Sequence, residues 1–296
     1  MATVVNLWGR LVPPEQAVIS VFDRGFLYGD SVYEVLRSYR GEPFRMEAHL
    51  ERLAASAERI ALEIPWSRER LTEEIRRTLE AAANDREGRE SYIRIIVTRG
   101  AGPIGLDPAL AEGPRVLVIV RPLEQPPPEA YQRGVEVAIV GVRRNAKDAV
   151  DPAAKTGNYL NNLLALKEAR DRGAYEAIML DAEGRIAEGS TSNVFLVRGG
   201  TLETPALETG ILEGVTRREV LSVAEALGVP TRECYLRPED LKQAEEAFLT
   251  STIREILPVT RVDGAPVGSG RVGEVTRRIM AGFRERTGPP LGVAPF

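Results

Sequence analysis

Residues 154–162 read Ala-Lys-Thr-Gly-Asn-Tyr-Leu-Asn-Asn and place Lys155 on a short turn before an apolar helical stretch. Two later segments belong with this one. Residues 187–195 (Ala-Glu-Gly-Ser-Thr-Ser-Asn-Val-Phe) put Glu188 at the end of one predicted strand and just before another. Residues 210–217 (Gly-Ile-Leu-Glu-Gly-Val-Thr-Arg) form a glycine-containing turn that opens a second helix. The three segments predict one site with an amine, a carboxylate and a helix start that can bind an anion.

This combination is what pyridoxal 5'-phosphate requires of a protein. An amine forms a Schiff base with the cofactor, a carboxylate keeps the ring nitrogen protonated, and a helix start binds the phosphate. Taken alone, Lys155 would be interpreted as a solvated surface lysine, and Glu188 as an exposed carboxylate in a turn. Their occurrence together with the helix start supports the cofactor.

Length, composition and charge set broad limits on the function. The chain has 296 residues, enough for one or two domains with a sizeable core. Its 43% hydrophobic and 28% charged residues are typical of a soluble globular protein. The net charge of -4 gives no reason to expect nucleic acid or a membrane as partner. Apolar runs are too short to span a bilayer and residues 1–10 show no secretory signal, so we expect a cytoplasmic protein.

Histidine and cysteine each occur once, which argues against several kinds of site. A zinc site needs about four ligands, usually rich in these two residues. A serine–histidine–aspartate triad would have to use His49, and no serine lies in a Gly-x-Ser-x-Gly turn. Cys234 has no partner for a disulfide within the chain. We therefore expect no metal, and acid–base chemistry carried by Lys, Tyr, Asp or Glu.

A proline-rich stretch divides the chain into two predicted domains. Residues 122–130 (Pro-Leu-Glu-Gln-Pro-Pro-Pro-Glu-Ala) favour extended backbone and predict a linker. We expect a smaller α/β domain over residues 1–121 and a larger one over 131–296, so the fold class is α/β (α+β). The expected strands are residues 4–8, 17–21, 31–39, 92–98, 116–120, 135–140, 176–180, 185–187, 193–197 and 247–249. The expected helices are residues 47–60, 67–83, 158–172, 216–227 and 273–284.

Lys155 is the predicted catalytic residue. Because Leu160, Leu163 and Leu164 follow it, we expect the lysine to lie at the start of a buried helix, partly removed from water. Such surroundings suit a Schiff-base lysine that also moves protons. Tyr159 would lie one helical turn away on the same face. It is either a core aromatic or the hydroxyl that binds the cofactor's phenolic oxygen.

Weaker candidates cluster around the predicted phosphate. No acidic residue follows Gly214 in Val215-Thr216, which leaves the helix N–H groups available for an anion, although many helices begin with glycine. Thr252 and its neighbour Ser251 carry hydroxyls in a polar turn. Arg52 lies between leucines on an amphipathic helix, where it extends to water or binds the phosphate.

These residues resemble a known family. The spacing that carries the resemblance is Glu188-x-Ser190-x-x-Asn193-Val194-Phe195, Leu202-x-Thr204 and Leu212-x-Gly214-Val215-x-Arg217. It is similar to the signature of the class IV (fold type IV) pyridoxal-phosphate aminotransferases along its full length. The similarity extends to residues 24–30, 49–53 and 248–252 and so covers nearly the whole chain.

The resemblance implies a fold and a set of roles. It implies a small α/β domain, a larger barrel-like α/β domain with the cofactor between them, and a homodimer or higher homo-oligomer. It implies Lys155 as the Schiff-base lysine, Glu188 as the partner of the ring nitrogen and Tyr159 as that of the phenolic oxygen. Leu212 would pack against the ring. The phosphate would be held by Arg52, Gly214, Val215, Thr216, Ser251 and Thr252.

The resemblance leaves the substrate open. The lysine segment and Tyr92-x-Arg94 look like branched-chain aminotransferases, in which a tyrosine and an arginine receive a carboxylate. Residues 28–35 and Val97-Thr98-Arg99-Gly100 look like D-amino-acid enzymes, yet the following loop lacks their further arginine and histidine. Arg99 or Arg37 could then bind a carboxylate singly. The expected substrate contacts are Tyr28, Tyr33, Arg37, Tyr92, Arg94, Arg99 and Ile253.

Our leading interpretation is a ping-pong transaminase acting on an L-branched-chain amino acid and a 2-oxo acid such as 2-oxoglutarate or pyruvate. The alternatives are a D-amino-acid transaminase, an R-selective amine transaminase and a lyase of the aminodeoxychorismate type. A non-catalytic relative would have no need of the set formed by Lys155, Glu188, Arg52 and Thr216.

Overall fold

The computed structural model describes residues 3–146 and 149–288 and divides into two units. The first contains residues 3–124 together with 154–158, and the second contains 125–146, 149–153 and 159–288. The division after Glu124 falls within the predicted linker. Residues 154–158, which include Lys155, belong to the first unit, although the segments before and after them belong to the second. We describe each unit by itself.

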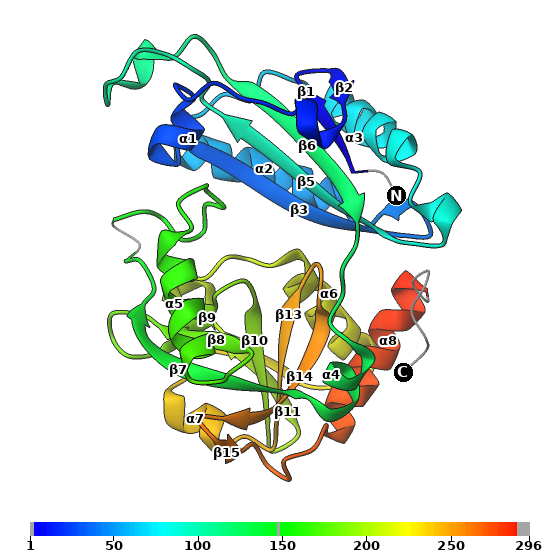
Figure 1. The fold of residues 1–296 in the computed structure, drawn as a ribbon. Coiled ribbons are helices and arrows are strands. Elements are labelled where there is room, and N and C mark those ends of the chain that lie inside the picture. Colours follow the sequence, from blue (N-terminus) through cyan, green and yellow to red (C-terminus); the bar gives the residue numbers. More distant parts are fainter. Residues whose placement is uncertain (1–2, 147–148, 289–296) are drawn as a thin grey trace. The chain divides into compact units, whose positions relative to one another are not determined.

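The first unit is built on a six-stranded sheet in the order β2-β1-β6-β5-β3-β4 (Figure 1). Each neighbouring pair is antiparallel. The strands are β1 (Val4–Leu7), β2 (Arg10–Val12), β3 (Ser31–Tyr39), β4 (Glu42–Pro43), β5 (Ser91–Thr98) and β6 (Arg115–Pro122). The helical elements are α1 (Arg24–Tyr28), α2 (Met46–Arg59) and α3 (Arg68–Ala82), with short 3-10 turns at Pro14–Gln16, Asp85–Glu87 and Pro108–Leu110.

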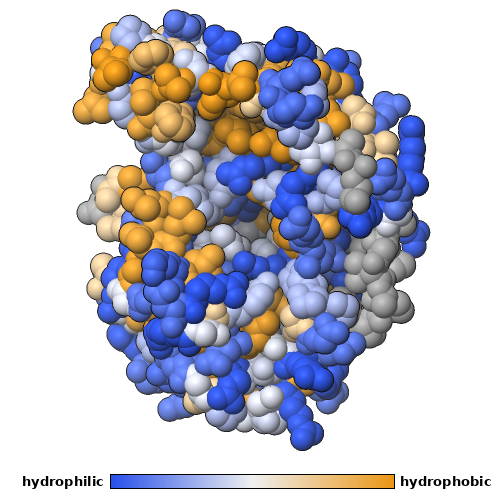
Figure 2. All heavy atoms as spheres, viewed as in Figure 1, coloured by the Kyte–Doolittle hydropathy of each residue, from blue (hydrophilic) through white to orange (hydrophobic). Residues whose placement is uncertain are grey.

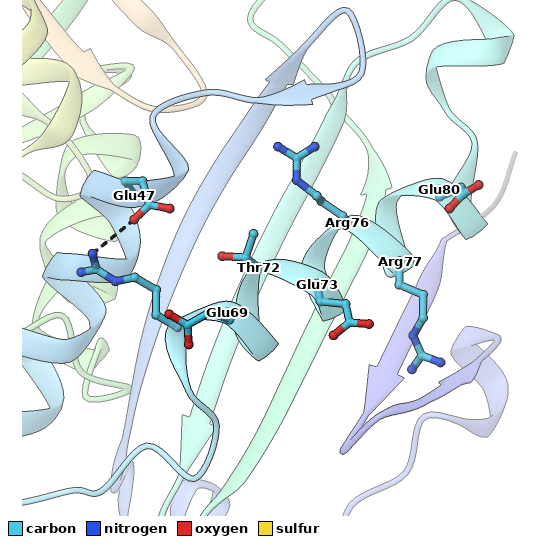
Figure 3. A pocket seen from close by; sticks show the side chains of 8 residues that line it. Glu47, Glu69, Thr72, Glu73, Arg76, Arg77 and Glu80 are labelled. Atoms are coloured by element: carbon cyan, nitrogen blue, oxygen red, sulfur yellow. Dashed lines mark hydrogen bonds and ion pairs between the residues drawn. The ribbon is translucent and has the colours of Figure 1, made fainter.

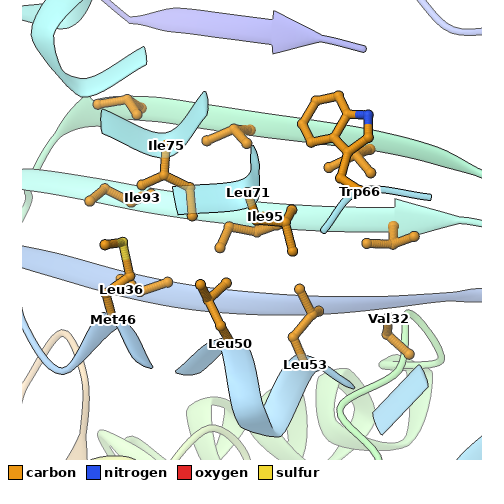
Figure 4. Close-up of a cluster of buried hydrophobic side chains, with 14 of the residues drawn as sticks. Val32, Leu36, Met46, Leu50, Leu53, Trp66, Leu71, Ile75, Ile93 and Ile95 are labelled. Carbon is orange, nitrogen blue, oxygen red and sulfur yellow. The ribbon is translucent and has the colours of Figure 1, made fainter. Parts of the chain in front are cut away.

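The core of this unit forms between the sheet and its helices. Figure 4 shows α2 side chains such as Leu50 and Leu53 meeting those of β3 and β5, with Leu71 and Ile75 of α3 beside them. Each helix repeats its apolar residues every three or four positions, so one face can be buried. Burying a side chain of this size is worth about 1.5–3 kcal/mol. Ser67 caps α3 by accepting from the Arg70 N–H, as its position in the sequence predicts.

The second unit contains a nine-stranded sheet in the order β12-β11-β10-β13-β14-β7-β8-β9, with β15 on β14, and it curls into an open barrel (Figure 1). The strands are β7 (Val135–Arg143), β8 (Glu176–Leu180), β9 (Ile186–Gly189), β10 (Asn193–Arg198), β11 (Thr201–Pro205), β12 (Thr231–Cys234), β13 (Glu246–Ser251), β14 (Glu255–Val262) and β15 (Ala265–Pro266). The helices are α4 (Pro128–Arg133), α5 (Leu160–Asp171), α6 (Val215–Ala226), α7 (Pro238–Lys242) and α8 (Glu274–Thr287), with a 3-10 turn at Leu207–Thr209.

The α/β class is confirmed, and the described residues include no helix that is long and apolar enough to cross a membrane. Two local expectations are wrong. Residues 17–21 form no strand, and β1 pairs instead with β2. The end of the predicted linker is helical, because Pro127 caps α4 and Pro128 occupies its first turn, where proline's missing N–H costs nothing.

Candidate functional site

The lysine segment is bound to β3 within the first unit, through an isolated bridge between Val32 and Thr156. The Lys155 carbonyl accepts from the Tyr33 N–H at 3.0 Å, and the Gly157 N–H donates to the Ser31 carbonyl at 2.8 Å. The Lys155 N–H donates to the Ser56 hydroxyl on α2 at 3.1 Å. A Cβ on Gly157 would lie 2.3 Å from Ser31 Oγ, so only glycine allows this approach without a shift. The chain thus fixes the backbone of Lys155 from two elements.

The expected helical setting of Lys155 is wrong. Helix α5 begins at Leu160, with Tyr159 as its N-cap, because the backbone groups of Lys155 and Gly157 already bond to other elements. Lys155 and Tyr159 are therefore not one helical turn apart on a shared face. The leucines expected to be buried are exposed: Leu160 by 68%, Leu163 by 60% and Leu164 by 50%. Asn162, Ala165 and Ala169 form the buried side of α5 instead.

Two cations lie on the ring of Tyr33. The Nζ atom of Lys155 is 4.5 Å from the ring centroid, and the Arg94 guanidinium carbon is 4.0 Å from the same centroid. The Nη1 atom of Arg94 donates to the Tyr92 hydroxyl at 3.4 Å. The first unit therefore brings the predicted reactive amine and the predicted carboxylate receptor to a common neighbour.

Arg99 is held in a structural role. Its Nε donates to Asp30 at 2.7 Å, and its two terminal nitrogens donate to the carbonyls of Ala61 and Ile60 at 2.8 and 2.9 Å. These bonds engage all three guanidinium nitrogens at the end of α2. A substrate carboxylate would have to displace them, which weighs against the predicted carboxylate-binding role of Arg99.

The remaining predicted substrate contacts of the first unit have varied surroundings. The Tyr28 hydroxyl accepts from the Gly105 N–H at 3.1 Å. Arg37 is 1% exposed and lies over the ring of Tyr39 at 4.3 Å. Because Arg37 is almost fully buried, its side chain could contact a substrate only if that side chain lines a pocket.

Arg52 is bound to a buried carboxylate. Its Nε and Nη2 atoms donate to the two oxygens of Glu34 at 2.7 and 2.9 Å. The His49 ring nitrogen Nδ1 is 2.7 Å from the same carboxylate. Burial alone would raise the pKa of Glu34, but the charge and hydrogen bonds of Arg52 outweigh it and hold the pKa well below 4.5. Burial lowers the pKa of His49 below 6.5 despite Glu34 beside it.

Glu188 lies on β9 of the second unit and accepts from three donors. Arg144 Nε lies 2.8 Å from Oε1, and the Leu212 N–H lies 3.1 Å from Oε2. The Asn193 amide donates to Oε2 at 3.4 Å and to the Leu212 carbonyl at 2.9 Å. These donors stabilise an ionised carboxylate, which is the form that can hold a protonated ring nitrogen.

The start of α6 can accept an anion. Gly214 is its N-cap, Val215 and Thr216 open it, and neither an acidic residue nor a side-chain cap occupies its first turn. Its first turn therefore offers N–H groups with no acidic side chain of the same turn to compete for them. A Cβ on Gly214 would lie 2.1 Å from Asn193 Oδ1, so the close approach requires glycine.

The polar turn at residues 251–253 lies near the same strand ends. Asn193, which bonds to Glu188, pairs across the sheet with Thr250, and Ser251 follows directly. The Ser251 hydroxyl accepts from the Arg254 N–H at 3.3 Å, and Thr252 and Ile253 form the turn. The second unit thus gathers Glu188, the α6 start and this turn at one end of its sheet.

Several polar residues that contact the predicted site residues are not predicted from the sequence. Three such residues form hydrogen bonds with predicted site segments that are distant in sequence. Glu34 accepts from Arg52, Arg144 donates to Glu188, and Glu176 accepts from Ser190. A usable signal exists for two of them. Glu34 shares a strand face with Val32 and Leu36, and Glu176 begins a strand that is otherwise apolar. A carboxylate on a buried strand face needs a partner.

A surface hollow elsewhere in the first unit is not part of this set. It encloses about 800 Å³ and is drawn in Figure 3. Its lining consists of charged side chains and one threonine, from Glu47, Arg68, Glu69, Thr72, Glu73, Arg76, Arg77 and Glu80. Glutamates and arginines both line it and partly neutralise each other, and no predicted site residue is among them.

Comparison with known proteins identifies relatives over almost the whole chain. The model of the family "Amino-transferase class IV" matches residues 31–262. A putative branched-chain-amino-acid aminotransferase of Methanocaldococcus jannaschii is 38% identical over 95% of this chain and 95% of its own. The aminodeoxychorismate lyase of Bacillus subtilis is 33% identical over 94% of this chain and 92% of its own.

A solved structure that contains the cofactor is similar in fold as well as in sequence. It is the crystal structure of an aminotransferase from Brucella abortus bound to pyridoxal phosphate. The TM-score is 0.86 at 25% identity, covering 98% of this chain and 100% of that one.

Proposed function

This chain belongs to the class IV aminotransferases, and from that premise we propose that it moves amino groups from L-branched-chain amino acids to a 2-oxo acid. It is a pyridoxal-phosphate-dependent transaminase. The proposal concerns the substrates, with 2-oxoglutarate or pyruvate as acceptor, and the roles of individual residues.

The described residues fit the cofactor. Gly214 leaves the space that a Cβ would fill beside Asn193, and the first turn of α6 carries no acidic side chain. Thr250 Oγ1 is buried with no hydrogen-bond partner among the described residues, beside the turn proposed to bind the phosphate. When bound, pyridoxal phosphate supplies a protonated ring that withdraws electrons from the carbon of the substrate that carries the amino group.

Lys155 and Glu188 carry the chemistry in this proposal. Lys155 Nζ would hold the cofactor through its aldehyde carbon and, as a free amine, would accept the substrate's α-proton and pass it to a different carbon, as transamination requires. Glu188 holds a proton on the ring nitrogen, with Arg144, Leu212 and Asn193 fixing the carboxylate. Tyr159 binds the phenolic oxygen and Leu212 packs on the ring. Phosphate binding falls to Arg52, Gly214, Val215, Thr216, Ser251 and Thr252.

The observation that carries the substrate proposal is the shared contact on Tyr33. Lys155 and Arg94 both lie on this ring, so a carboxylate bound by Arg94 and Tyr92 would be near the reactive amine. Arg99, the arginine favoured by a D-amino-acid interpretation, is fully engaged with Asp30 and two carbonyls. Tyr28, Tyr33, Arg37 and Ile253 complete the proposed substrate contacts.

A homodimer is the proposed assembly. Both units expose large apolar side chains, and Figure 2 shows hydrophobic residues gathered over α1 and over α5. Contiguous exposed apolar surface of this kind marks an interaction site. The exposed residues are Val18, Val21, Phe22, Phe26, Ile104 and Leu106 in the first unit and Leu160, Leu163 and Leu164 in the second. The cytoplasmic location predicted from the sequence is retained in this proposal.

A lyase activity is the second candidate, favoured by the similarity to the Bacillus subtilis lyase. It would use the same lysine and release pyruvate without any amino acceptor. Pyruvate formation from aminodeoxychorismate in the absence of a 2-oxo acid would establish it. Its absence leaves transamination alone.

The test of the proposal is the absorbance of the purified protein loaded with pyridoxal phosphate. L-leucine without an acceptor should consume the absorbance band of the lysine-bound cofactor, and D-alanine should not. Lys155→Ala should lack that band, while Lys167→Ala, an exposed lysine on α5 paired with Asp171, should retain it. Bleaching by D-alanine alone would contradict the L-branched-chain assignment.

A further inference from the structure

A buried carboxylate lies behind the arginine proposed for the phosphate. Glu34 is 0% exposed and belongs to the face of β3 that also carries Val32 and Leu36. That face packs against α2, where Leu50 and Leu53 complete the apolar surroundings (Figure 4). A charged group in this position is costly unless it is paired and hydrogen-bonded.

The pairing of Glu34 with Arg52 is geometrically specific. Two parallel bonds of 2.7 and 2.9 Å join both carboxylate oxygens to Nε and Nη2 of the guanidinium. A planar guanidinium held at two nitrogens has little freedom to rotate. His49, three residues before Arg52 on the same helix face, lies 2.7 Å from Oε2 and restrains the carboxylate in turn.

Stability alone does not account for this arrangement. Removing two charges from water costs about as much as their attraction returns, and apolar residues of similar size often serve a core equally well. Val32 and Leu36 on the same strand face, and Leu50 and Leu53 on α2, belong to the apolar core, so such a replacement was open to this sequence. What an apolar group could not supply is a fixed direction for the guanidinium.

We propose that Glu34 is a positioning residue that orients the Arg52 guanidinium toward the cofactor's phosphate, with His49 holding the Glu34 carboxylate in place. The inference rests on the proposed role of Arg52. It assigns Glu34 no contact with the cofactor or the substrate.

The test compares two forms of the cofactor on the cofactor-free protein. Pyridoxal has the same aldehyde and ring nitrogen as pyridoxal phosphate but lacks the phosphate. Glu34→Gln should weaken pyridoxal phosphate binding about tenfold, because a charge-assisted contact is lost, and leave pyridoxal binding unchanged. Glu42→Gln, at an exposed glutamate that pairs with Arg76, should change neither. Equal weakening of both ligands would overturn the proposal in favour of a purely structural role.

A double variant, compared with Arg52→Gln, tests the proposal even if Glu34→Gln folds poorly. The double variant Glu34→Gln/Arg52→Gln removes both charges and so avoids leaving one buried alone. It should show the same preference for pyridoxal phosphate over pyridoxal as Arg52→Gln, because Glu34 acts only through Arg52. A further drop in that preference would overturn the proposal.

The same comparison also separates this inference from the proposed function. If Arg52→Gln kept the normal preference for pyridoxal phosphate over pyridoxal, Arg52 would not bind the phosphate. The proposed positioning role of Glu34 would then fail as well. The roles of Lys155 and Glu188, read from the absorbance band, would stand.

Discussion

Arg254 reaches the fully buried carboxylate of Glu176 with an Nη1–Oε2 distance of 2.6 Å. The same guanidinium donates through Nη2 to the Thr191 hydroxyl at 2.9 Å. Glu176 also accepts from the Ser190 N–H and hydroxyl. One ion pair therefore joins the residues that follow Glu188 to the turn that contains Ser251 and Thr252.

Removing one partner of this pair should be costly. Arg254→Met leaves the Glu176 charge buried and is expected to lower the free energy of unfolding by about 3–5 kcal/mol. Urea unfolding of the cofactor-free protein measures the change. Arg261→Met breaks the more exposed contact with Glu136 and should cost about 1 kcal/mol or less. Equal losses in the two variants would show that burial of Glu176 does not set the cost.

Arg144 should matter for the reaction through Glu188. Arg144→Gln removes the cation 2.8 Å from the Glu188 carboxylate and should lower kcat about 10- to 100-fold, the range of a charge-assisted hydrogen bond. The matched control is Arg143→Gln, because its neighbour Arg143 is exposed on β7. Single-turnover absorbance changes with L-leucine give the rates. An unchanged rate in Arg144→Gln would mean that Leu212 and Asn193 suffice to hold Glu188.

Gly157 should be sensitive to the smallest side chain. Gly157→Ala puts a Cβ against Ser31 Oγ and should shift the lysine segment, lowering activity about 10²- to 10⁴-fold if proton transfer by Lys155 is lost. Gly141→Ala is the control, because its Cβ meets only the Glu168 carboxylate at 3.6 Å or more. Full activity in Gly157→Ala would show that Ser31 rotates away without consequence.

Acid should destabilise the first unit through His49. The pKa of His49 is lowered by burial, so the unfolded chain binds a proton that the folded chain rejects. Stability should therefore fall as the pH drops through 6.5, by at most about 1.4 kcal/mol per pH unit for this one group. The lowered pKa of Glu34 adds a loss in the same direction below pH 4.5.

Urea unfolding of the wild type and of His49→Gln between pH 5 and 7.5 tests this expectation. Glutamine does not titrate, so His49→Gln should flatten the dependence of stability on pH. Glu34, Arg52 and Lys155, the other charges that act on His49, are the same in both proteins. Identical slopes would locate the acid sensitivity elsewhere.

The exposed leucines of α5 should hold two copies together. Leu163→Glu/Leu164→Glu is expected to convert the dimer to monomers at micromolar concentration, because charge is placed on an apolar contact face. Sedimentation velocity measures the mass. Leu207→Glu, at another partly exposed leucine, should leave the assembly intact. A dimer that persists in the α5 variant would direct attention to the apolar residues around α1.

The sequence predicts the segments of the site better than their geometry. The residue types around Lys155, Glu188 and the α6 start indicate an amine, a carboxylate and an anion-binding helix start. The setting of Lys155 depends on hydrogen bonds to Ser31 and Tyr33, more than a hundred residues earlier, which no local pattern reveals. Helical periodicity after Leu160 therefore does not show where the helix begins relative to the lysine.

The exposed side of α5 has a similar origin. Leucines at helical spacing predict a buried face, and the pattern does not say whether that face packs on its own chain or on another. Arg144 carries no local signal of its role, because that role comes from a contact across the fold. Glu34 could have been singled out, since it interrupts the apolar face of an alternating strand.

His49 is the one histidine in the chain, and it lies in the cluster behind Arg52. Its imidazole signals in a nuclear magnetic resonance spectrum therefore need no assignment by mutation. Any movement of the Glu34 carboxylate on filling the site, and any change of tautomer, would be read from a single set of resonances. The protein carries a built-in reporter for the loading of its own cofactor.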